Sequence, residues 1–111
     1  MPTAQDFDRV VEHVLGCTPH PRSHLKWQFK IQGRLVSWCM RSHGLRRSAQ
    51  LSERNLSEMA NQMRCSTGVW KRLLNGQATR TDYLNELLSR DVITREQYDS
   101  ALREFATGGH P

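Results

Sequence analysis

The stretch RSHLKWQFKIQGRLVSWCM, residues 22–40, is the most informative part of the sequence about the fold, because apolar and polar side chains alternate along it. A two-residue period is typical of a β-strand with one buried face and one face in water. The apolar residues of the first half are Leu25, Trp27, Phe29 and Ile31, and they alternate with Lys26, Gln28 and Lys30. Gln32-Gly33 then favours a tight turn. The stretch therefore predicts a β-hairpin.

The return strand of this hairpin ends at Met40. We expect one face in the core and the other outside it: Val36, Trp38 and Met40 inward, and Leu35, Ser37 and Cys39 on the opposite face. In the first strand His24 is in phase with Lys26. His24 therefore points away from the core if the strand begins that early.

Helical patterns flank the hairpin on both sides. Residues Asp6–Leu15 carry one apolar stripe, and Gly16 is a natural stop. The prolines of CTPHPRS (17–23) cannot continue that helix. The segment RSHGLRRSAQ (41–50) indicates a basic loop with room for a short third strand. From Leu51 the period is helical, with Ser66 and the TREQ box at Thr94 as expected helix starts.

This order predicts an α+β fold in a single domain, residues 1–111. Residues 1–50 form a helix and a small antiparallel sheet, residues 51–106 form about four helices, and residues 107–111 form a loose tail. The apolar residues expected to face inward from the four helices are Leu56, Met59, Ala60, Met63, Val69, Trp70, Leu73, Leu74, Tyr83, Leu84, Leu87, Leu88, Tyr98, Leu102 and Phe105.

The composition indicates a basic globular protein. The chain has a net charge of +5, and 24% of its residues are charged. It shows no apolar run of membrane length and no signal peptide, so we expect a soluble cytoplasmic protein without a membrane partner. Its three widely spaced cysteines argue against a disulfide scaffold.

A basic surface attracts polyanions, and nucleic acid is the commonest polyanion of a cell. A solvated surface that is merely basic is the simpler alternative. If nucleic acid binds, the candidate contacts are Lys26, Lys30, Arg34, Arg41, Arg46, Arg47, Arg64, Thr67, Lys71 and Arg72.

The segment LSEMANQMRCSTGVWKRLLNG, residues 56–76, has the spacing of a helix-turn-helix unit. Ala60 is a small residue at the helix crossing, Ser66 opens the second helix, and Trp70 anchors it. The segment resembles the Cro/repressor class, although Arg64 stands where glycine is usual and a hairpin replaces the preceding helix. The resemblance implies a DNA-binding regulator in which residues 67, 68, 71 and 72 approach the groove.

The N-terminal half, residues 6–45, resembles HicA-type toxins of bacterial toxin–antitoxin systems. The resemblance rests on an initial helix, Ser23-His24 before an alternating strand, and a Gly33-Arg34 turn, with Arg22 where the family usually has glycine. It implies a double-stranded-RNA-binding-domain-like fold, RNA cleavage by His24 and an antitoxin partner. Residues 24–94 are also similar to small uncharacterised prokaryotic proteins.

The chemistry of such a nuclease would be simple. Histidine titrates near neutral pH, so His24 can exchange the protons of RNA cleavage while Lys26 and Lys30 hold the phosphate. A second acid–base group is lacking unless His43 approaches from the other strand. A histidine on a wet face is, however, more often a bystander.

Four further possibilities concern a metal, the tryptophans, a protein partner and a homodimer. Cys17-x2-His20 and Cys39-x3-His43 have zinc-like spacing, but Cys39 lies within a strand, so we predict no metal and no cofactor. The three tryptophans, Trp27, Trp38 and Trp70, fall on apolar faces and are expected in the core rather than stacked on bases. A phage- or plasmid-encoded protein that acts on a protein partner, and a homodimer, stay open.

Overall fold

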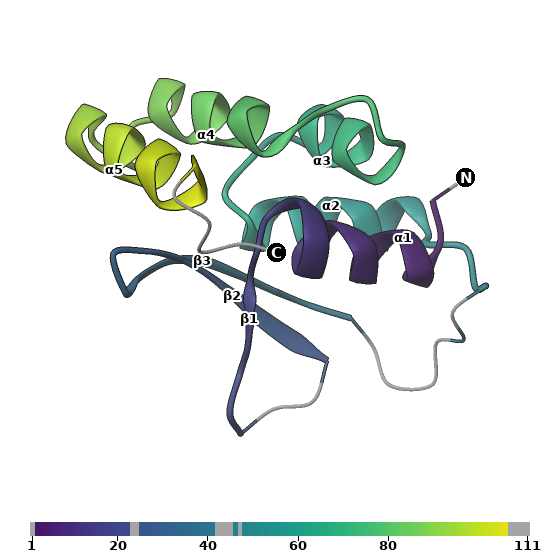
Figure 1. The fold of residues 1–111 in the computed structure, drawn as a ribbon. Coiled ribbons are helices and arrows are strands. Elements are labelled where there is room, and N and C mark those ends of the chain that lie inside the picture. The colour runs from purple at the N-terminus through teal and green to yellow at the C-terminus, as the bar shows by residue number, and fades with distance from the viewer. Residues whose placement is uncertain (1, 23–24, 42–45, 47, 107–111) are drawn as a thin grey trace.

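The computed structural model describes residues 2–22, 25–41, 46 and 48–106. It confirms the α+β fold: an N-terminal helix, a three-stranded antiparallel sheet and then four helices in the described part of the chain (Figure 1). One continuous core cluster extends from Phe7 in the first helix to Ala101 in the last.

The N-terminal helix is α1 (Ala4–Arg9), followed by the π-helical turn η1 (Val10–Val14). A capping box starts it, because the Thr3 hydroxyl accepts from the Asp6 N–H and the Asp6 carboxylate accepts from the Thr3 N–H. Gly16 ends the segment with a φ of 66°, a left-handed conformation that glycine adopts without strain. The helix therefore lies where the apolar stripe predicts it, but its last turn is π-helical rather than α-helical.

The sheet has the order β1-β2-β3, formed by β1 (Thr18–Pro19), β2 (Lys26–Ile31) and β3 (Arg34–Met40). Gln32 and Gly33 have φ values of 53° and 75°, as a hairpin turn with two left-handed residues requires. The hairpin is thus confirmed. The third strand of the described sheet lies before the hairpin, at residues 18–19. Much of the segment 41–50, where the sequence left room for a strand, lies outside the described residues.

The predicted faces of the return strand are right for Leu35, which is exposed, and Val36, which is buried, but wrong from Ser37 to Met40. Ser37 pairs with Phe29 and Cys39 pairs with Trp27, so both are buried on the core side. The register shifts between Phe29 and Lys30, where Val36 is an extra residue on β3. This bulge reverses the alternation after Val36, so Trp38 and Met40 lie on the outer face.

The four C-terminal helices are α2 (Glu53–Gln62), α3 (Thr67–Leu74), α4 (Arg80–Ser89) and α5 (Arg95–Ala106). Ser52, Ser66 and Thr79 accept hydrogen bonds at the starts of α2, α3 and α4. The predicted capping box before α5 is present, because the Thr94 N–H donates to Gln97 and the Gln97 N–H donates to the Thr94 hydroxyl.

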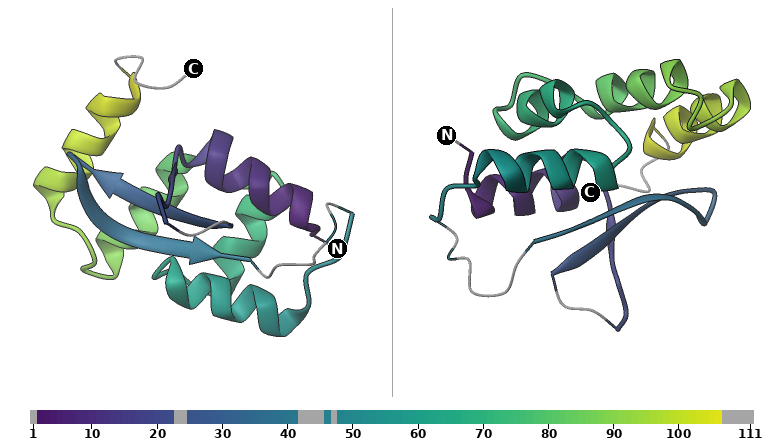
Figure 2. Two further views of the ribbon diagram at one scale, coloured as in Figure 1. Left: turned by 90° about the horizontal axis from the view of Figure 1, so that it is seen from below. Right: turned by 180° about the vertical axis from the view of Figure 1, so that it is seen from behind.

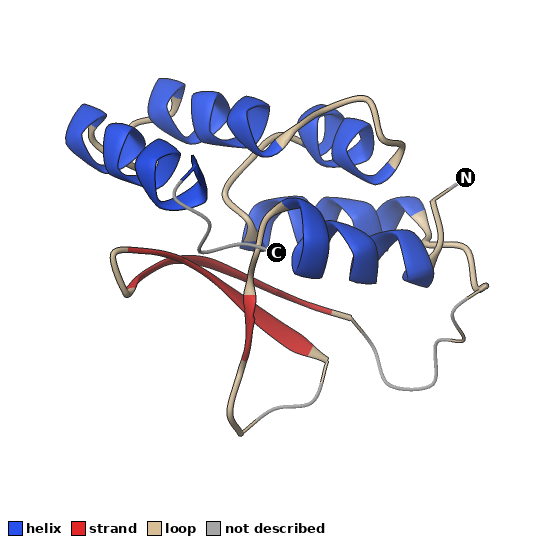
Figure 3. Cartoon of the chain, in the orientation of Figure 1, coloured by secondary structure: helices blue, strands red, loops and turns tan. Residues whose placement is uncertain are grey.

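All the described helices lie on one side of the sheet (Figures 1 and 3). Helices α1 and α2 lie next to the strands, α3 and α4 form a layer behind them, and α5 lies over the hairpin end, where Glu104 accepts from the Gln32 N–H at 2.7 Å. Figure 2 shows, from below, β2 and β3 with no helix in front of them. The sheet therefore has a covered inner face and an outer face that the described part of the chain leaves open.

Candidate nucleic-acid interface

The positive charge of the chain is concentrated in the part that forms the sheet. Residues 13–52 contain seven Lys and Arg residues and no Asp or Glu. The rest of the chain carries nine basic and eleven acidic residues, a net charge of −2. The excess charge of the protein therefore comes entirely from the segment that includes β1, β2 and β3.

The outer face of β2 and β3 combines cations with exposed apolar side chains. Alternation places every second residue of β2 on this face. On β3 the bulge at Val36 shifts the alternation by one residue, so that Trp38 and Met40 lie on this face as well. The residues on the outer face are Lys26, Gln28, Lys30, Leu35, Trp38 and Met40. Leu35 is 54% exposed and Met40 is 42% exposed, the two large apolar residues of the described chain that are most open to solvent.

Trp38 stands at the centre of this outer face, and its prediction as a core residue is wrong. Its indole is half-buried, and the Lys26 ammonium lies 4.5 Å from the centre of the ring. That separation is within the range of a cation–π contact. Trp27 and Trp70, by contrast, are buried as predicted.

A groove of roughly 570 Å³ lies between β3 and the end of α2. Leu35 and Trp38 line its strand side, and Asn61, Gln62 and Arg64 line its helix side. Gln62 Oε1 accepts from the Met40 N–H at 3.2 Å, and the Arg64 guanidinium donates to the Val36 carbonyl at 3.4 Å. The groove thus has an aromatic wall and a polar wall, with a cation at its rim.

The predicted cationic contacts differ in how accessible they are. Lys30, Arg34, Arg46 and Arg64 are exposed, and Lys26 is half-buried against Trp38. Arg41 has a structural role instead: its Nε and Nη2 donate to the two carboxylate oxygens of Asp8 at 2.8 and 3.1 Å. This pair ties the end of β3 to α1.

The remaining N-terminal candidates, His24, His43 and Arg47, lie outside the described residues. The sequence predicts that His24 points away from the core only if the strand begins that early, but Leu25 has a φ of 62° and β2 begins at Lys26. The orientation of His24 therefore stays a prediction. RNA cleavage by His24 and His43 stays a prediction.

Residues 56–76 contain most of α2 and all of α3, two helices joined by a short turn, and the helix-turn-helix resemblance stays a prediction. Arg64 adopts a φ of 60° at the tight turn, and Ser66 caps α3 through the Val69 N–H. Thr67 is half-buried, and Gly68 and Arg72 are exposed.

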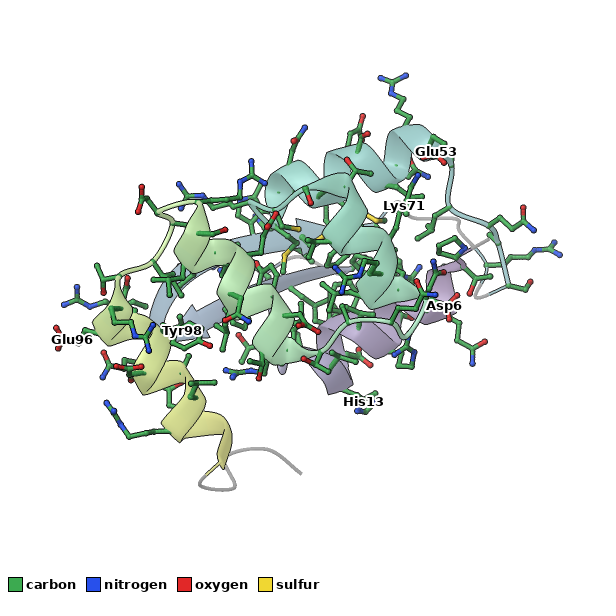
Figure 4. All side chains as sticks on the ribbon, turned by 90° about the horizontal axis from the view of Figure 1, so that it is seen from above. Asp6, His13, Glu53, Lys71, Glu96 and Tyr98 are labelled. Carbon is green, nitrogen blue, oxygen red and sulfur yellow. The ribbon has the colours of Figure 1, made fainter. Side chains whose placement is uncertain are left out.

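Carboxylates nevertheless accompany the cations of α3. Lys71 donates to Glu53 on α2 at 3.0 Å, and Figure 4 shows the two side chains side by side. Glu86 Oε2 accepts from the Ser66 N–H at 2.8 Å, at the helix start where a phosphate could otherwise bind. The exposed side of α3 is therefore less favourable to a polyanion than the sheet face.

Two of the four residues with zinc-like spacing, Cys17 and Cys39, are buried thiols. Burial raises the pKa of the Cys17 thiol to about 12 and raises the pKa of Cys39 well above its usual value. His20 Nδ1 accepts from the Arg22 N–H, and His43 lies outside the described residues. Within the described ranges no group of three or more His, Cys, Asp or Glu residues could hold a metal ion.

Comparison with protein-family models, with curated proteins and with solved structures finds no match in any of the three. Over the described residues, no helix is long and apolar enough to cross a membrane.

Sequence reasoning missed Trp38 and the groove beside it. The signal that could have indicated this face is the absence of Asp and Glu from residues 13–52.

Proposed function

We propose that the protein binds nucleic acid, RNA in preference to DNA, on the outer face of its sheet. The observation that carries the proposal is the separation of charge: seven cations and no carboxylate in residues 13–52, against a net charge of −2 elsewhere. A surface of one sign raises the local concentration of polyanions and steers their approach.

The arrangement of the outer face supports binding of a nucleic acid with unpaired bases. Phosphates need cations, and Lys26 and Lys30 lie on the outer face of β2, with the exposed Arg34 at the start of β3 and no acidic residue on either strand. Unpaired bases need apolar or aromatic surface, and Trp38 supplies it beside Lys26. Sequence-specific recognition of RNA mostly targets such unpaired bases.

The direct test is a binding titration with labelled RNA and DNA at two salt concentrations. The test variant is Lys26→Ala/Lys30→Ala on the sheet, and the matched control is Lys71→Ala/Arg72→Ala on α3, which removes the same charge. We expect the sheet variant to bind about 25-fold more weakly at 0.1 M salt and to lower the salt slope by roughly 1.4, because each phosphate contact on a single strand contributes about 0.7. The α3 control should bind almost normally.

The alternatives predict different outcomes of the same experiment. Absence of binding to RNA and to DNA at 50 mM salt would refute the proposal and favour a protein partner. A loss confined to the α3 variant would favour the helix-turn-helix regulator. Products run on a gel test cleavage, which should depend on His24 if the HicA-like hypothesis holds.

A further inference from the structure

We infer that the preferred ligand is a single strand, and that one of its bases stacks on Trp38 in the groove between β3 and the end of α2. This inference rests on the proposed function and specifies the class of nucleic acid. A base in a duplex has both faces covered by its neighbours, so only an unpaired base can place a face on an indole.

The position of Trp38 favours stacking on the groove side of the ring. Lys26 comes from β2, on one side of Trp38, and the groove lies on the other side, along the free edge of β3. The Lys26 ammonium can therefore remain against the ring while a base enters the groove. The groove volume of roughly 570 Å³ is of the size of clefts that hold small ligands, about 300–1,000 Å³.

The opposite wall of the groove offers hydrogen bonds to the edge of a base. Gln62 uses its side-chain oxygen on the Met40 N–H, so its amide nitrogen is the group that can donate to a ligand. Asn61 is exposed beside it and carries both a donor and an acceptor. Arg64 lies at the rim, where its guanidinium can reach a phosphate.

The backbone of β3 adds a donor and an acceptor at the same place. The Arg41 N–H donates to the Leu25 carbonyl across the hairpin, and the Met40 N–H points the other way, to Gln62. Backbone groups of successive residues alternate between the two sides of a strand, so the N–H and C=O of Trp38 face the groove. A base stacked on Trp38 thus lies near main-chain polar groups.

A protein strand fits this edge less well than a nucleic acid does. Gln62 and Arg64 already bond to the edge at Met40 and Val36, and the bulge at Val36 bends it. Such features oppose the addition of another strand. The exposed cations Lys30, Arg34 and Arg64 favour a polyanion over a neutral or basic peptide.

The test compares a single-stranded RNA 12-mer with its duplex, using wild type, Trp38→Ala and Trp38→Phe. We expect the single strand to bind more tightly than the duplex. Trp38→Ala should weaken the single strand about 5- to 100-fold with an unchanged salt slope, because stacking is not ionic. Trp38→Phe keeps an aromatic face and should retain most of the affinity.

Tryptophan fluorescence gives a second measurement that does not depend on Trp38→Ala folding. Trp27 and Trp70 are buried, so a change of emission on adding RNA should come from Trp38 and should vanish in Trp38→Phe. Equal binding of duplex and single strand, with no effect of either Trp38 variant but a loss in Lys26→Ala/Lys30→Ala, would overturn this inference and leave the proposed function intact. No binding by any of these proteins would overturn both.

Discussion

The sheet segment, residues 13–52, and the helical half, residues 53–106, differ in their balance of acidic and basic residues. Residues 53–106 contain eight basic and eight acidic residues, and ion pairs such as Lys71–Glu53 and Arg54–Glu58 join residues of this half to one another. Residues 13–52 have no acidic residue at all, and within the described part of this segment Arg41 pairs with Asp8, a carboxylate of α1. The helical half is thus electrically neutral, and the sheet segment remains attractive to anions.

The two regions also divide the apolar residues unequally. The helices bury most of theirs in the core, whereas the outer face of β3 leaves Leu35 and Met40 largely exposed and Trp38 half-exposed. Burying apolar surface stabilises a fold, and leaving it in water gives no such gain. The comparison indicates that the helices stabilise the sheet and that the outer face of the sheet is available for a ligand.

The largest expected effect comes from exchanging the tryptophan of the helical half. Trp70 is fully buried, and its ring lies 6.2 Å from that of Phe7, so Trp70→Ala should lower the free energy of unfolding by about 3–5 kcal/mol. Trp38→Ala on the outer face should cost about 1 kcal/mol or less. Urea denaturation of both variants measures the difference. Equal costs would mean that Trp38 is part of the core.

A smaller effect is expected where the two regions meet. The buried Tyr83 hydroxyl donates to the Met63 carbonyl at 2.7 Å and lies 2.7 Å from the Ser37 hydroxyl of β3. Tyr83→Phe leaves both partners unsatisfied and should cost about 1–3 kcal/mol of stability. The matched control is Tyr98→Phe, because the Tyr98 hydroxyl bonds Asn85 near solvent and water can replace it. Equal Tm values for the two variants would contradict this account.

The sequence predicted local structure well, because local structure depends on nearby residues. The hairpin turn at Gln32-Gly33, the cap at Ser66 and the capping box at Thr94 all have the expected geometry. The four helices follow from apolar stripes that recur every three to four residues. Each of these features is encoded within a few neighbouring positions.

The faces of β3 could not be predicted in this way. A strict alternation places Trp38 inside and Ser37 outside, but one extra residue at Val36 reverses the pattern, and the buried Ser37 hydroxyl is satisfied by Tyr83, 46 positions away. Strand β1 is only two residues long and depends on pairing with β2. The candidate site was missed for the same reason, because it exists only once the bulge turns Trp38 outward.

Reversing one positive charge in each region tests whether the sheet or the helices bind RNA. Lys30→Glu should weaken single-stranded RNA binding at least about fivefold at 0.1 M salt, since losing one phosphate contact alone corresponds to that factor. Arg72→Glu on α3 makes the same change of net charge and should alter binding less than about twofold. Filter binding at several salt concentrations measures both. Equal losses would mean that net charge, rather than the sheet face, determines the affinity.

The smallest effect is expected at the start of α4, in the neutral half. The Asp82 carboxylate accepts from the Thr79 N–H at 2.8 Å and from the Thr79 hydroxyl, and these hydrogen bonds lower the pKa of Asp82. A carboxyl whose pKa is lower in the folded state stabilises the fold above its unfolded pKa, near 3.9, and loses this contribution as pH falls through the folded pKa.

Asp82→Asn should therefore lower the Tm at pH 6, and the difference should shrink as the pH falls through the lowered pKa of the folded Asp82 carboxyl. Asp91→Asn removes the same charge from an exposed position and controls for net charge. Calorimetry between pH 2 and pH 7 measures the difference in Tm between each variant and wild type. If the difference for Asp82→Asn stays constant with pH, the charge of the carboxylate does not contribute to the cap. If the difference decreases on acidification, the ionised carboxylate stabilises the first turn of α4.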